Sequence, residues 1–354
     1  MVAIRHRVAI ASWLLVSVAA VFAMICIGGI TRLTESGLSM VEWRPLIGIF
    51  PPVSEAEWQR IFELYQKTPE FLLINNGMDL AAFKTIFWWE YIHRLWGRLI
   101  GVIFALPFVF FLVKGWLTPR LIIRLVGLLA LGALQGLIGW WMVKSGLTER
   151  PDVSQYRLAV HLVVALIILA CLFYLALTLL IPQTRRVRVR RSLYGHAWLV
   201  VAAVLATMVS GAFVAGTNAG LIYNTFPLMG GRLLPAEYAH MAPFWLNWFE
   251  NPAAIQFNHR LLACGTFVVT AMLWWRCRNS RINRANHVAV TTLMAVACLQ
   301  VSLGIVTLVT IVPIPLAATH QGVAVLLLLS AVATAFTLQP RGKAVSIPVA
   351  AVPA

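Results

Sequence analysis

Eight apolar runs, each long enough to cross a lipid bilayer, constrain the fold of this chain more than any other feature. A hydrocarbon core of about 30 Å takes roughly 20 helical residues. Of the 354 residues, 60% are hydrophobic and only 11% are charged, which is typical of membrane proteins. We therefore predict an all-α polytopic membrane protein with eight transmembrane helices, near 8–30, 89–113, 121–143, 158–181, 195–217, 255–276, 287–311 and 316–338.

The basic residues are concentrated in alternate loops between these runs. More than half of the 28 Lys and Arg residues lie there, and none of the 12 acidic residues does. Basic loops remain in the cytoplasm, so we expect both termini to be cytoplasmic. The net charge of +16 then reflects membrane topology and does not indicate a nucleic-acid partner. Only about seven residues precede the first run, too few for an organelle transit peptide, so we expect a bacterial inner (cytoplasmic) membrane.

The second half of the chain repeats the first. Residues 24–40 parallel 208–224, HRLWG parallels HRLLA, and LQGLIG parallels LQVSLG. Each half holds four apolar runs, an even number, so both halves enter the membrane in the same orientation. Such a parallel repeat is related by a pseudo-twofold axis along the membrane normal. We therefore predict two four-helix bundles side by side.

The predicted domain boundaries follow from this repeat. The N-terminal bundle covers 1–183, with a long outer loop at 31–88, and the C-terminal bundle covers 195–340. A basic cytoplasmic linker at 184–194 joins them, and a cytoplasmic tail follows at 341–354. In the outer loop, SEAEWQRIFELYQ begins with Ser-x-x-Glu and has apolar residues at helical spacing. This pattern predicts a capped amphipathic helix on the outer surface.

Four histidines occupy matching places in the two halves. His93 and His259 begin the second helix of their half, and His161 and His320 begin the fourth, near the outer ends. A lone histidine in a membrane helix is more often a hydrogen-bonded core residue than a ligand. The fourfold match favours ligands, because the second and fourth helices of a bundle lie diagonally and facing imidazoles make an axial pair for haem iron. We predict two haem sites, one in each half.

A polar stripe surrounds the first of these histidines. Its members fall on one face of a helix and must face the protein interior or a wet cavity; they are Glu90, His93, Arg94, Gly97, Arg98 and Gly101. Arg94, Arg98 and Arg260 are candidates to pair with haem propionates, since guanidinium binds carboxylate bidentately. Snorkelling of these arginines to the outer interface is the alternative.

The two halves differ at one informative position. Glu90 in the first half becomes Gln256 in the second, at the same place relative to the histidine. Glutamine neither exchanges a proton nor carries a negative charge, so chemistry confined to one half should occur in the first. The sequence contains no HExxH, Cys-x-x-Cys, phosphate loop or dinucleotide fingerprint, which favours chemistry supplied by a bound haem.

Together these segments resemble the haem A synthases of bacteria and mitochondria. The resemblance covers almost the whole chain and is carried by the segments GGITRLTESGLSM, EYIHR, LQGLIGWWMV, NTFPLMGG, FNHR, LQVSLGIVTL and ATHQ. It implies eight membrane helices in two pseudo-symmetric four-helix bundles. It also implies an enzyme that oxidises the C8 methyl group of haem O to a formyl group by successive hydroxylation and loss of water.

The resemblance implies roles for individual residues. His259 and His320 would ligate a resident haem B, the cofactor, in the second half. His93 and His161 would hold the substrate haem O in the first half, with Glu90 as the essential carboxylate. We hypothesise that haem B relays electrons while Glu90 manages protons or stabilises positive charge.

The resemblance also has a departure and implies partners. Some members carry a cysteine pair in the first outer loop, whereas this chain has no cysteine between Cys26 and Cys171, so a thiol-based mechanism there is in doubt. Haem O synthase and cytochrome oxidase assembly are expected partners beside the lipid bilayer. The sequence leaves a homo-oligomer open.

Two other functions fit parts of the pattern. A di-haem b-type electron carrier linked to quinol would use the same histidine pairs and would not need Glu90. A transporter with parallel repeats would explain the symmetry, but its polar groups should lie at the midplane and not at one face.

Overall fold

The computed structural model describes residues 4–42, 49–148, 151–181 and 189–340. Within these residues the chain forms α-helices, two short 3₁₀ helices and no strand. The α-helices are α1 (Ile4–Leu33), α2 (Glu55–Tyr65), α3 (Pro69–Leu73), α4 (Leu80–Val113), α5 (Pro119–Thr148), α6 (Gln155–Leu180), α7 (Arg191–Gly216), α8 (Pro252–Arg278), α9 (Arg284–Val309) and α10 (Ile314–Thr337).

The membrane class predicted from the sequence is confirmed. Seven of the long helices in the described residues are apolar enough to cross a bilayer, namely α1, α4, α5, α6, α7, α9 and α10. Helix α8 has 27 residues, enough in length, but it is less apolar because it carries Gln256, Asn258, His259 and Arg260 near one end and arginines near the other. The eighth span therefore remains a prediction.

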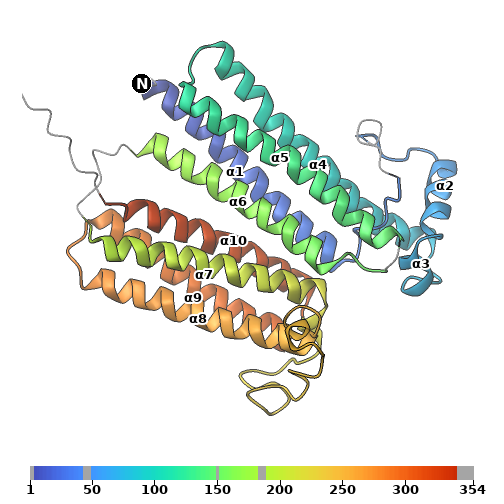
Figure 1. The fold of residues 1–354 in the computed structure, drawn as a ribbon. Coiled ribbons are helices and arrows are strands. Elements are labelled where there is room, and N and C mark those ends of the chain that lie inside the picture. The colour runs from blue at the N-terminus through green and yellow to red at the C-terminus, as the bar shows by residue number, and fades with distance from the viewer. Residues whose placement is uncertain (1–3, 43–48, 149–150, 182–188, 341–354) are drawn as a thin grey trace, which may run out of the picture.

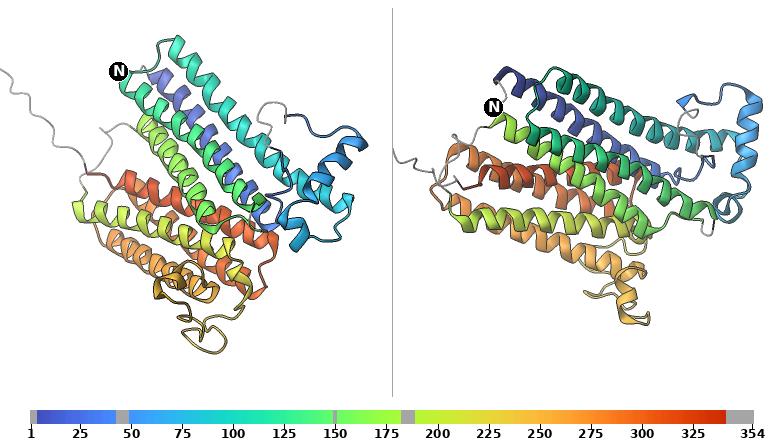
Figure 2. Two further views of the ribbon diagram at one scale, coloured as in Figure 1. Left: turned by 45° about the vertical axis from the view of Figure 1, so that its right-hand side comes forward. Right: turned by 45° about the horizontal axis from the view of Figure 1, so that its top comes forward.

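The long helices form two groups that lie side by side (Figures 1 and 2). In the first group α1 contacts α4 and α6, and α5 contacts the same two helices. In the second group α7 contacts α8 and α10, and α9 contacts the same two. Each group is thus a ring of four neighbours, which places α4 diagonally from α6 and α8 diagonally from α10.

Helix α4 is longer than the apolar run that predicts it. It begins at Leu80, where the side chain of Asp79 accepts a hydrogen bond from the Ala82 backbone N–H at 2.8 Å. Because the polar residues Lys84 and Thr85 interrupt the apolar sequence, this first part of α4 does not belong to the apolar run. Phe83 and Phe87 in this part are nevertheless buried, because the loop that contains α2 covers them.

The amphipathic helix predicted in that loop is α2. Ser54 caps it by accepting a hydrogen bond from the Glu57 backbone N–H at 3.2 Å. Its apolar face, which includes Trp58 and Phe62, packs on Phe83 and Phe87 of α4. Helix α2 therefore covers the end of the first group, where burial of aromatic area stabilises it. Figure 1 shows α2 and α3 at the end opposite to the N-terminus.

The two groups contact each other through α1, α6, α7 and α10. Gln321 Nε2 of α10 donates to the Ile25 carbonyl of α1 at 2.8 Å. A Cβ at Gly29 would lie 2.3 Å from Gln321 Oε1, so glycine makes this close approach possible. Arg32 at the end of α1 donates to the Asn218 side chain, just beyond α7, at 3.2 Å.

A second link joins the start of α6 to the residues just before α8. Glu250, just before α8, accepts hydrogen bonds from Gln155 Nε2 at 2.8 Å and from the Tyr156 hydroxyl at 2.6 Å. Both donors begin α6. A carboxylate from one half thus fixes the start of the helix that carries His161 in the other half.

Candidate functional site

The four histidines predicted as ligands lie in two facing pairs. His93 on α4 interacts electrostatically with His161 on α6, and His259 on α8 does so with His320 on α10. The helices of each pair are diagonal in their ring, so the imidazoles meet across the centre of each bundle. All four lie in the N-terminal half of their helices. The structure therefore brings together the residues that the repeat pairs in sequence.

Each histidine ring lies against a glycine of a neighbouring helix. A Cβ at Gly28 would lie 3.5 Å from the His93 ring, and one at Gly211 would lie 3.2 Å from the His259 ring. A Cβ at Gly139 would lie 3.0 Å from His161, and one at Gly304 2.9 Å from His320. These glycines make room for the imidazoles, and sequence reasoning missed this role. The signal was present, because Gly28 matches Gly211 and Gly139 matches Gly304 in the repeat.

Glu90 is buried on α4 and accepts hydrogen bonds at both carboxylate oxygens. Oε1 accepts from Arg94 Nη2 at 2.5 Å. Oε2 accepts from the Ser39 hydroxyl and from the Met40 backbone N–H, each at 2.7 Å. The i,i+4 spacing of Glu90 and Arg94 could predict their contact, whereas Ser39 arrives from the loop after α1 and was not predicted. An acceptor-only group fits these three donors.

The matching site around Gln256 has the same frame and different hydrogen bonding. Gln256 Nε2 donates to the Tyr223 carbonyl at 3.2 Å, and its Oε1 accepts from Arg260 at 3.3 Å. Tyr223 matches Met40 in the repeat. One half therefore directs a backbone N–H at a carboxylate, and the other directs an amide at a backbone carbonyl. The backbone of the loop in each half thus matches the side chain it contacts, a carboxylate at Glu90 and an amide at Gln256.

Arg94 and Arg260, each next to a histidine in the sequence, donate hydrogen bonds to the loops that follow α1 and α7. Arg94 donates to the Met40 carbonyl at 2.9 Å and to the Glu42 carbonyl at 3.3 Å. Arg260 donates to the carbonyls at the matching positions, Tyr223 at 2.8 Å and Thr225 at 2.9 Å. Within the described residues, Nε of Arg260 is buried without a hydrogen-bond partner. Pairing of Arg94, Arg98 and Arg260 with propionates stays a prediction.

Polar side chains hold the second histidine pair. The Ser210 hydroxyl lies 2.8 Å from His259 Nδ1, and the Gln300 amide nitrogen lies 3.2 Å from His320 Nδ1. In the first pair, Nδ1 of His161 is buried without a hydrogen-bond partner in the described part of the chain. Sequence reasoning missed Ser210 and Gln300. Ser210 stands beside Gly211, and Gln300 lies in the repeated LQ dipeptide, which is the signal that could have found them.

These residues fit a haem in each bundle. Facing imidazoles from diagonal helices would hold a haem iron. The bordering glycines leave the rings free of side chains, and the unpartnered Nδ1 of His161 and Nε of Arg260 are buried polar atoms that a bound group or water would satisfy. The donor set thus suits a macrocycle held between helices.

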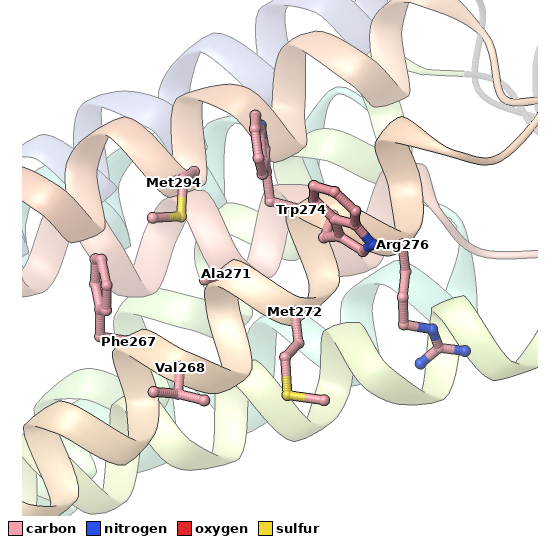
Figure 3. A pocket seen from close by; sticks show the side chains of 8 residues that line it. Phe267, Val268, Ala271, Met272, Trp274, Arg276 and Met294 are labelled. Atoms are coloured by element: carbon pink, nitrogen blue, oxygen red, sulfur yellow. The ribbon is translucent and has the colours of Figure 1, made fainter.

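The apolar groove in Figure 3 is separate from this site. It lies on α8 and α9, is lined by Phe267, Met272, Trp275 and Met294 among others, and ends at Arg276. No histidine lines it. Its place along α8, away from His259 and toward the basic end of the helix, is that of a lipid-facing surface.

The fold and the site define a class: an all-α, multi-pass membrane protein with a facing histidine pair in each of two helix groups. The chain belongs to the COX15-CtaA family, described as cytochrome oxidase assembly protein, whose model matches residues 11–332. The family resemblance expected from the sequence motifs is thereby confirmed.

Several relatives carry the same printed name. A "Heme A synthase" from Rhodospirillum centenum is 53% identical over 333 residues, covering 94% of this chain and 89% of that protein. One from Nitrosospira multiformis is 47% identical and covers 91% of each chain. "Heme A synthase COX15" of Bos taurus is 47% identical, covering 87% of this chain and 77% of that protein. The similarity thus extends across bacterial and mammalian proteins and along nearly all of this chain.

Proposed function

We propose that this chain is a haem A synthase, a membrane oxidoreductase that converts the C8 methyl group of haem O into the formyl group of haem A for cytochrome oxidase. Relatives of that name at 47–53% identity support this. The observation that carries the proposal within the chain is the difference between Glu90 and Gln256. Two equivalent electron-carrying haem sites would not need a carboxylate in one half only.

We assign the substrate to the first half and the cofactor to the second. His93 and His161 would hold haem O in residues 1–183, and His259 and His320 would hold haem B in residues 195–340. A haem B bound there would supply electron transfer to and from the reacting half. The contacts between α1 and α10 and between α6 and α7 form a wall shared by the two sites.

Glu90 acts at the substrate side of this arrangement. Arg94, Ser39 and the Met40 N–H fix both of its oxygens, so the carboxylate keeps one orientation beside His93. A fixed acceptor there can take or return a proton as the methyl group is oxidised, or stabilise positive charge that develops near it. In the second half Gln256 can do neither, which suits a site that only holds its haem.

The outer loops exclude water from the reacting half. Helix α2 and the aromatic cluster beneath it cover the part of α4 that includes Phe87 and Tyr91, and Glu90 between them is buried. Burial in an apolar surrounding strengthens each charge–charge contact at the site. This cover has no counterpart of the same length in the second half, where residues 218–251 follow α7.

We place the protein in the bacterial inner membrane with both termini cytoplasmic and both haem sites toward the outer face. Its partners would be haem O, delivered by the enzyme that makes it, and the assembly pathway of cytochrome oxidase. The basic charge that supports this topology lies partly in the linker and the tail, at 182–188 and 341–354, which are outside the described residues.

The test is the pigment made by cells that contain the chain. We expect haem A to appear when the chain is expressed in cells that produce haem O and haem B but no haem A of their own. Haems are extracted from the membranes and separated by chromatography. A di-haem carrier would leave only haem O and haem B in the extract, and that result would reject the proposed function.

A further inference from the structure

The ring of His259 is held by a chain of two hydrogen bonds. The Ser210 hydroxyl donates to the Thr207 carbonyl one turn earlier on α7 at 2.7 Å, and it lies 2.8 Å from His259 Nδ1. A hydroxyl has one hydrogen. Because that hydrogen goes to Thr207, Ser210 must accept from His259, so Nδ1 carries the ring proton. The lone pair of the imidazole is therefore on Nε2, where a metal can bind.

The first half lacks this arrangement at the matching place. Gly28 and Gly211 both lie against a histidine ring, so the residues before them, Ile27 and Ser210, are equivalent in structure as well as in sequence. Isoleucine offers no acceptor to His93. At this helix position the second half therefore has a hydroxyl that contacts His259, whereas the first half has only the methyl and methylene groups of Ile27.

The second histidine of each half differs in its contacts with the repeated glutamine. The Gln300 amide nitrogen lies 3.2 Å from Nδ1 and 3.4 Å from Nε2 of His320. Its repeat partner Gln135 instead donates to the backbone carbonyl of His161 at 2.9 Å. Nδ1 of His161 is consequently buried without a partner among the described residues. Polar side chains therefore contact both rings of the second half, and at His259 the contact supplies a proton acceptor for Nδ1.

We propose that Ser210 is a positioning residue that fixes His259 for permanent haem ligation, and that Ile27 at the matching position makes the first-half site an exchangeable one. The inference rests on the proposed function, which requires one haem to stay and another to enter and leave. An acceptor on the far ring nitrogen orients a metal-binding histidine and raises its basicity, and removal of such an acceptor typically costs about 10–100-fold in metal affinity. A substrate site gains from its absence because the product must be released.

The test exchanges the two residues in the full-length protein. Ser210→Ala removes the acceptor, Ser210→Thr retains a hydroxyl, and Ile27→Ser adds one to the first half. Each variant is purified in detergent with its haems, and release of each haem to excess apomyoglobin is timed from its absorbance spectrum. The midpoint potential of the second-half haem is measured by redox titration.

Ser210→Ala should release the second-half haem about 10–100-fold faster and shift its potential to a more positive value, since a less basic imidazole favours ferrous iron. Ser210→Thr should behave as the wild type, and Ile27→Ser should slow release from the first half. Unchanged release and potential in Ser210→Ala, or in Ile27→Ser if Ser210→Ala does not fold, would overturn the inference. Failure of the proposed function would appear separately, as a wild-type protein without haem O or haem A.

Discussion

At the residue scale, the difference between the two halves is concentrated around Glu90. The exchange of Glu90 for Gln256 is visible in the sequence because the histidines align the repeat. The sequence does not reveal which groups donate hydrogen bonds to this carboxylate, because Ser39 and Met40 approach from a loop whose path depends on the whole fold. Candidate ligands could therefore be predicted from the sequence, whereas the side chains that orient them required the structure.

The glycines beside the histidines give a prediction at the same scale. Gly304→Ala should displace His320, because the new Cβ would lie 2.9 Å from its ring. Overpacking of this kind costs about 1–3 kcal/mol, and the displaced ring should bind haem B poorly. We expect a lower ratio of haem B to protein after purification, measured as the pyridine haemochrome.

The control is Gly265→Ala on α8, where a new Cβ meets nothing within 4 Å. Alanine also favours a helix over glycine by about 1 kcal/mol, so this variant should keep its haem and lose no stability. Equal haem content in both variants would show that Gly304 is not needed to seat His320.

At the element scale, the apolar runs predict the long helices because backbone groups in a bilayer must be satisfied within the segment. Their ends were harder to predict. Helix α4 extends outward to Leu80 because α2 covers its aromatic face, and no local pattern of α4 reveals that cover. Helix α8 is less apolar than the other long helices because of the polar side chains near its start, so the span predicted at 255–276 remains a prediction.

The cover itself contains a titrating group. Glu70 on α3 is buried beside the Tyr65 hydroxyl, which donates to it at 3.0 Å. Burial raises the pKa of Glu70 from 4.5 to about 8, and the charges of Glu90, Glu35 and Asp152 act in the same direction. The folded loop therefore holds a proton that the unfolded loop loses above about pH 4.5.

We expect the stability of the α2–α3 cover to fall as pH rises from about 4.5 to 8, since the folded state binds more protons over this range. Glu70→Gln keeps an acceptor for Tyr65 and should remove the dependence. Amide hydrogen exchange of α2 and α3 at pH 6 and pH 8.5, corrected for intrinsic rates, measures it. Glu63→Gln, at an exposed position of α2, is the matched control and should retain the wild-type pH response. A wild-type pH response in Glu70→Gln would contradict this prediction.

At the scale of the whole molecule, two similar groups of four helices share one wall. The repeat predicts their likeness, and the ring of contacts in each group has the form expected of a four-helix bundle (Figure 2). The sequence could not predict how the groups meet, because that contact depends on single close approaches such as Gly29 with Gln321. The division into a substrate half and a cofactor half remains our proposal.

The most direct test of that division compares the haems extracted from membranes that contain wild-type chain or Glu90→Gln, in cells that make haem O and haem B. In the variant, the amide N–H of the glutamine would face a group that donates a hydrogen bond to the carboxylate in the wild type. The amide also cannot accept a proton during turnover. Loss of an acid–base group typically lowers a rate about 10²–10⁴-fold. We predict retained haem B with little or no haem A, and accumulation of haem O or its alcohol. Haem A at the wild-type level from Glu90→Gln would contradict the claim that the chemistry occurs at Glu90 in the first half.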